Sequence, residues 1–157
     1  MEGLLLSIHV LAGIVFVGGS AIAASLFPRY APVAVDSAVG DAPTQAPTER
    51  NQAVAVALHR VTRGYGLFGI VVPVVGIAAA MVQGRIGEIW ITVSMILTAV
   101  AGGLLALQIY PRQRDALATP GGGERLRKLS MLAGIYNLLW ATVVVLMIVR
   151  PGSAEAA

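Results

Sequence analysis

Two histidines are the residues of this chain whose side chains could hold a cofactor. His9 lies in a run without charge, residues 3–27, and His59 lies in a basic segment further along. A neutral imidazole nitrogen can ligate haem iron or a metal, or it can hydrogen-bond a quinone. An ionisable residue at membrane depth is a candidate functional residue by default. His9 is therefore a candidate haem ligand; the alternative is a neutral imidazole that hydrogen-bonds a hydroxyl or a backbone carbonyl.

His59 has a second feature in its favour. Arg63 follows it by one helical turn, so the imidazole could ligate a haem while the guanidinium pairs with a propionate. The alternative is a basic amphipathic segment that lies on the anionic lipid surface.

The neighbours of His9 on a helix indicate where it points. At three- and four-residue steps they are mostly small, and the pairs Gly19/Ala23 and Ser20/Ala24 allow close helix approach. We expect His9 to face the other helices and not the lipid. Three methionines, Met81, Met95 and Met147, fall in the same half of the membrane and could add a thioether ligand, although methionine usually fills gaps in a core.

No other set of residues suggests catalysis. The chain has no cysteine, no charged residue inside the apolar spans, and no Ser/His/Asp set, carboxylate pair or phosphate-binding glycine loop. We therefore predict no enzyme, no metal site and no resident cofactor, with haem b as the alternative. The basic residues stand at helix ends without interleaved aromatics, so we predict no nucleic-acid partner.

The composition indicates an integral membrane protein. It is 57% hydrophobic and 12% charged, against about 25% charged in soluble domains. Four apolar segments predict an all-α, four-helix transmembrane bundle in one domain, 1–157. We expect helices at 3–27, 49–83, 88–110 and 124–149, with Thr48 as an N-cap, a kink near Pro73, Pro111 ending the third helix, and a Pro-rich loop at 28–48.

An even number of spans places both termini on one side, and the basic residues predict which side. Nine of the eleven Lys and Arg residues lie in the two long loops and the helix starts that follow them. The positive-inside rule then makes these loops cytoplasmic and the termini external. His9 falls in the external half and His59 at the cytoplasmic face, so the two histidines cannot share one haem. The basic helix starts should contact lipid headgroups.

A faint internal repeat is visible as well. Gly18-Gly19 precede Pro28-Arg29, and Gly102-Gly103 precede Pro111-Arg112. The chain is either two copies of one helical hairpin or a sequence in which such pairs recur by chance.

The opening SIHVLAGIVFVGGS, with the pattern His-x-x-x-Gly-x-x-x-x-Gly-Gly, resembles the first helix of small bacterial four-helix membrane proteins. These include copper-resistance D-type domains, membrane protoporphyrinogen-oxidase-like proteins and a family of unknown function. The resemblance implies haem or metal handling at His9. The overall plan is also similar to accessory proteins of actinobacterial respiratory complexes, which implies a bacterial plasma-membrane subunit beside other membrane subunits.

Two functions follow as expectations. The first is a non-catalytic accessory subunit or assembly factor of a larger membrane complex, a respiratory one by the resemblance. The alternative is a b-type haem or redox protein that uses His9. A transporter is disfavoured because the spans carry so few polar groups.

Overall fold

The protein is an all-α, four-helix transmembrane bundle. The computed structural model describes residues 2–34 and 50–152. Within these ranges four helices, Gly3–Tyr30, Gln52–Val82, Ile89–Ala118 and Gly123–Val149, are long and apolar enough to cross a membrane. At about 1.5 Å per residue the shortest, with 27 residues, exceeds a hydrocarbon core of about 30 Å.

Local changes of helical geometry divide these spans into shorter elements. They are α1 (Glu2–Ala12), the π-helical turn η1 (Gly13–Val17), α2 (Gly18–Tyr30), α3 (Gln52–Phe68), α4 (Val71–Val82), α5 (Ile89–Leu104), the π-helical turn η2 (Leu105–Ile109), α6 (Tyr110–Ala118) and α7 (Gly123–Val149).

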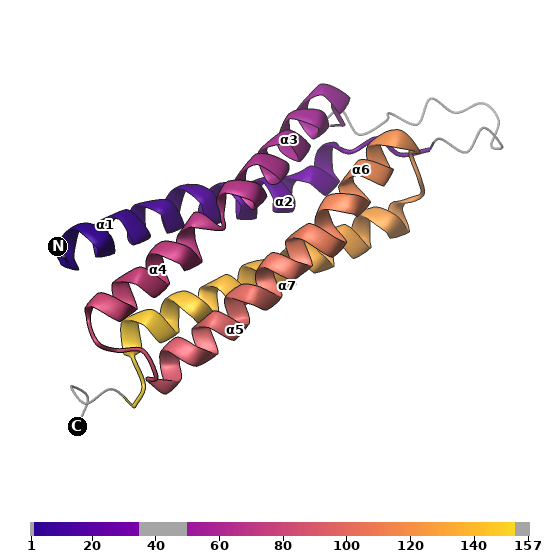
Figure 1. Cartoon of the computed structure of the whole chain (residues 1–157). Helices are drawn as coiled ribbons and strands as arrows, with labels where there is room; N and C mark the ends of the chain where they lie inside the picture. The colour runs from indigo at the N-terminus through magenta and orange to yellow at the C-terminus, as the bar shows by residue number, and fades with distance from the viewer. Residues whose placement is uncertain (1, 35–49, 153–157) are drawn as a thin grey trace, which may run out of the picture.

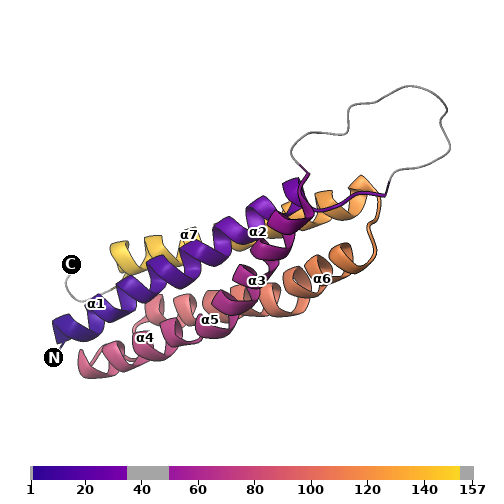
Figure 2. The same ribbon diagram turned by 90° about the horizontal axis from the view of Figure 1, so that it is seen from above.

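The helices form two pairs that separate toward one end of the molecule. At the end where the chain begins and ends, α1 packs on α4 and α5 packs on α7 (Figure 1). At the other end, α2 contacts both α3 and α7, and α3 contacts α6. Figure 2 shows from above that the N- and C-terminal ends of the described chain lie at the same end of the bundle. The two pairs are therefore joined firmly at one end and loosely at the other.

The first span runs further than predicted. Pro28 does not end it; the helix continues to Tyr30 and stops where Ala31 takes an extended conformation, with φ −61° and ψ 142°. Proline is tolerated inside transmembrane helices because neighbouring groups can satisfy the backbone that it frees. The carbonyl of Ala31 accepts a hydrogen bond of 2.7 Å from Arg50. Beyond it, the backbone N–H of Ala34 bonds the carbonyl of Gly121, and most of the predicted 28–48 loop lies outside the described residues.

The second span begins later than predicted. Its N-cap is Asn51, whose side-chain oxygen accepts from the backbone N–H groups of Ala53 at 2.9 Å and Val54 at 3.3 Å. Asparagine is among the best N-cap residues because it satisfies these otherwise unpaired donors. The residue predicted for this role, Thr48, lies outside the described residues.

The break in the second span lies where its proline predicts it. Helix α3 ends at Phe68 and α4 starts at Val71, two residues before Pro73. Proline has no N–H for the carbonyl of Gly69; that carbonyl instead accepts a hydrogen bond of 3.1 Å from Val72. The chain thus satisfies the freed carbonyl within the break.

The prediction that Pro111 ends the third span was wrong. The helix passes from α5 through η2 into α6 and continues to Ala118, with Pro111 in the first turn of α6. In η2 the backbone N–H of Tyr110 bonds Leu105, five residues back. Such a widened turn changes the spacing of the carbonyls just before the proline ring, which a regular helix would bring into collision with it. The other π turn, η1, precedes its Gly-Gly pair whereas η2 follows its own, so the two turns do not occupy equivalent places in the suggested repeat.

Glycines set the closest approaches between helices. A Cβ on Gly19 would lie 1.9 Å from the ring of Tyr65, and one on Gly66 would lie 3.2 Å from Leu105. Small residues let backbones approach in this way where lipid removes the usual hydrophobic drive to pack. Two polar links join α2 to α7: the hydroxyls of Ser20 and Tyr136 at 2.7 Å, and the Asn137 amide donating to Ser25 at 2.9 Å.

Candidate functional site

His9 is held against the start of α4. Its Nδ1 atom lies 3.0 Å from the backbone carbonyl oxygen of Val72. A carbonyl only accepts, so Nδ1 carries the hydrogen and Nε2 of the neutral ring keeps a lone pair. Histidines that ligate metals usually donate their other ring nitrogen to such a carbonyl, which fixes the tautomer. The hydrogen bond to Val72 therefore leaves the lone pair of Nε2 available to accept a hydrogen bond or to ligate a metal.

The ring of His9 packs against a glycine of α4. A Cβ on Gly76 would lie 2.7 Å from Cε1 of His9 and 3.1 Å from Nδ1. No side chain larger than hydrogen fits there while the ring stays in place. Sequence reasoning found the small residues around His9 on its own helix but missed Gly76; the available signal was a glycine three residues after the helix-bending Pro73.

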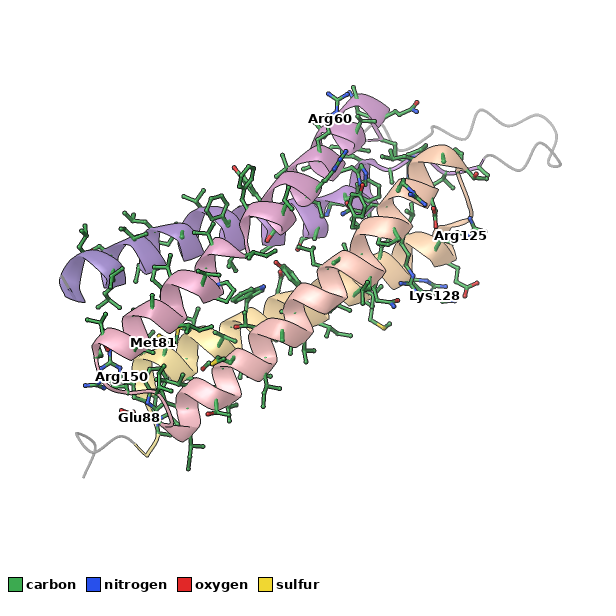
Figure 3. The ribbon with its side chains drawn as sticks, in the orientation of Figure 1. Arg60, Met81, Glu88, Arg125, Lys128 and Arg150 are labelled. Carbon is green, nitrogen blue, oxygen red and sulfur yellow. The ribbon has the colours of Figure 1, made fainter. Side chains whose placement is uncertain are left out.

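His9 lines a cavity of about 390 Å³ between the α1/α4 pair and the α5/α7 pair. The structure places all three of the methionines considered as thioether ligands, Met81, Met95 and Met147, around this same cavity. Figure 3 shows Met81, Glu88 and Arg150 at the terminal end of the bundle. The remaining wall is largely apolar, so the cavity suits a hydrophobic ligand that carries a few polar atoms.

The opposite wall holds a buried polar atom without a hydrogen bond to any described residue. The hydroxyl of Ser94, on α5, is 3% exposed and lines the cavity, and it has no hydrogen-bond partner within the described part of the chain. Buried hydroxyls normally find a partner, because leaving one unpaired costs free energy. Sequence reasoning missed Ser94 because a lone serine in an apolar helix gives no periodic signal.

An aromatic and a basic residue, Trp90 and Arg150, line the cavity and contact each other. The guanidinium carbon of Arg150 lies 5.8 Å from the centre of the Trp90 ring, and Arg150 Nε donates to the carbonyl of Met147. The indole N–H of Trp90 donates to Glu88. Interfacial tryptophan and arginine are expected at this depth of a membrane span.

A second hollow of about 380 Å³ adjoins the first and is lined by residues of η1, α3, α4, α5, η2 and α7. It extends toward Phe16 and Tyr65 and shares Pro73, Thr98 and Trp140 with the first. The two hollows therefore lie side by side, with shared wall residues on α4, α5 and α7.

His59 lies in a different environment. Its ring stacks on Tyr110, with centroids 4.9 Å apart and planes 14° from parallel, and its Nδ1 lies 3.2 Å from the side-chain oxygen of Gln113. Gln113 is fully buried on α6, and its amide nitrogen has no partner among the residues that the structure describes. Arg63, the predicted propionate partner, is exposed. Sequence reasoning missed Gln113 because it follows Pro111, where the helix was expected to have ended.

The structure does not bring the two histidines together. His9 contacts α4 near the terminal end, whereas His59 contacts α6 near the end where α6 joins α7. Among the described residues no group of three or more His, Cys, Asp and Glu side chains could hold a metal ion. Comparison with protein-family models, curated proteins and solved structures returned no match.

Proposed function

We propose that the protein is a non-catalytic accessory subunit or assembly factor of a larger membrane complex. The observation that carries this proposal is an exposed small-residue pair on α7, Ser130 and Gly134, four residues apart and in a membrane span. A Cβ on Gly134 would meet nothing within 4 Å. Such pairs mark places where a second helix approaches closely. We assign the complex to the respiratory chain of a bacterial, actinobacterial plasma membrane, on the resemblance to respiratory accessory proteins.

The distribution of charge supports an orientation for this subunit. Arg60, Arg125 and Lys128 lie at the end where α6 joins α7, the connection end, and Arg150 lies at the terminal end (Figure 3). We infer from the positive-inside rule that the connection end is cytoplasmic and the termini external. The partners are then other integral membrane subunits, with lipid headgroups at the basic helix starts.

The test is native purification of the tagged full chain in mild detergent, with its companions identified by mass spectrometry. A Gly134→Leu variant should lose the partner subunits because the added side chain blocks helix approach. Gly3→Leu is the matched control, since a Cβ there also meets open space. Recovery of the wild-type chain only as a free monomer would refute the proposal, as would equal recovery of partners with both variants.

One observation favours a second candidate, a b-type haem protein. The bond from His9 to Val72 leaves Nε2 as a possible axial ligand facing a cavity. Oxidised and dithionite-reduced absorption spectra of the purified protein decide the matter. A Soret band in the wild-type protein that is absent from the His9→Ala variant would support the haem protein and contradict the accessory subunit.

A further inference from the structure

Two residues, each with a polar atom that no other described residue pairs, line the main cavity from its two walls. Nε2 of His9 comes from α1 in the α1/α4 pair, and the buried hydroxyl of Ser94 comes from α5 in the α5/α7 pair. Neither forms a hydrogen bond with another described residue. A ligand that bonds both atoms must therefore carry polar groups on two sides.

The tautomer of His9 decides what the ligand offers. Because Nδ1 donates to the Val72 carbonyl, Nε2 of a neutral His9 ring accepts. The ligand must present a hydroxyl or another donor at that point; a ligand carbonyl would face a lone pair. The Ser94 hydroxyl can donate or accept, so it suits either partner.

The shape of the space decides the rest of the ligand. Apart from these two atoms and the buried indole N–H of Trp140, the cavity is lined mainly by apolar, thioether and aromatic side chains, and the second hollow adjoins it. A long apolar tail would extend toward the adjoining hollow, and an aromatic head would contact the tryptophans that line the cavity.

We propose that this cavity binds the hydroquinone form of an isoprenoid quinone, with one ring hydroxyl donating to His9 Nε2 and the other bonding Ser94. The ligand has two hydroxyls on opposite sides of one ring and a membrane-soluble tail, which matches the two walls and the adjoining hollow. This binding does not depend on the accessory-subunit proposal, because it needs no partner chain. A haem on His9 would occupy the same space and is an alternative occupant.

The test titrates a decyl-tailed benzohydroquinone, kept reduced and anaerobic, into the purified full chain in lipid nanodiscs. The chain has two tryptophans and both line the cavity, so their fluorescence reports occupancy directly. We expect saturable quenching, with the hydroquinone bound about three- to tenfold more tightly than the matching quinone, the ratio that one net hydrogen bond provides.

Variants connect this difference to the two polar atoms. His9→Phe should abolish the preference for the reduced form, and Ser94→Ala should weaken binding of both forms. His59→Phe makes the same change at the other histidine and should bind like the wild type; circular dichroism checks that each variant folds.

Three results would overturn the proposal. They are equal affinity of the wild type for the hydroquinone and the quinone, a preference that survives in His9→Phe, and a Soret band in the purified protein. Quenching that rises linearly without saturation in every variant would show simple partition into lipid and would count against it equally. If His9→Phe does not fold, the wild-type comparison of the two redox forms still decides.

Discussion

The imidazole of His9 lies over the α-carbon of Gly76, so closely that a methyl group there would stand 2.7 Å from Cε1. This contact joins α1 to α4 and directs Nδ1 to the carbonyl of Val72 one turn earlier. The ring orientation, its tautomer and the packing of two spans are therefore coupled through a single glycine.

Gly76→Ala should move the His9 ring and break its bond to Val72. Overpacking of this kind costs about 1–3 kcal/mol of stability, and it should also weaken binding of any cavity ligand. Thermal unfolding followed by circular dichroism measures the first effect. Gly134→Ala is the control, because a methyl group there meets open space; a Gly76→Ala protein as stable as this control would show that the contact is absent.

Gly19→Ala should destabilise the bundle where α2 meets α3. The added methyl group would stand 1.9 Å from the Tyr65 ring, which contacts Phe16 edge-on. We expect a loss of about 1–3 kcal/mol. The neighbouring Gly18→Ala adds the same group where nothing lies within 4 Å, so it should leave the midpoint of unfolding unchanged or raise it. The opposite order of the two midpoints would contradict the packing described.

Asn51→Ala should unwind the first turn of α3. The substitution removes the acceptor for the N–H groups of Ala53 and Val54, a loss of about 1 kcal/mol for an N-cap. Amide hydrogen exchange at these two residues should quicken, while Gln52→Ala, beside the cap, should exchange like the wild type. Unchanged protection in Asn51→Ala would mean that another residue caps the helix.

The orientation across the membrane can be tested on an unusually clean background, because the chain has no cysteine. Ile86, between α4 and α5, and Thr119, after α6, are both exposed. An impermeant maleimide added to intact cells should label the Ile86→Cys variant and should label Thr119→Cys only after permeabilisation. Labelling in the reverse order would invert the proposed orientation.

The sequence predicted the membrane-spanning helices well because each depends on a long apolar run, a property that the chain carries locally. It misjudged their ends at Pro28 and Pro111, since whether a proline stops a helix depends on how the freed carbonyls are satisfied. At Pro111 the preceding π turn allows the helix to continue. No residue type in the sequence predicts such a turn.

The candidate site was predicted only in part. His9 and the three methionines could be placed in one half of the bundle from their positions along the helices. Gly76 and Ser94 could not, because the role of Gly76 comes from its contact with His9 on another span, and a lone serine in an apolar helix gives no periodic signal. Val72 contributes through its backbone, so its side chain carries no signal at all.

The Val72 carbonyl holds His9 with its hydrogen on Nδ1, so that Nε2 of the neutral ring is an acceptor on a residue that lines the cavity. The most direct measurement is nitrogen NMR of the histidine-labelled protein in nanodiscs, which distinguishes protonated from unprotonated ring nitrogens. His59→Gln removes the only other histidine and so assigns the signals. We predict a neutral His9 ring with hydrogen on Nδ1 and none on Nε2; hydrogen on Nε2 would contradict both the hydrogen bond and the preference for a hydroxyl-bearing ligand.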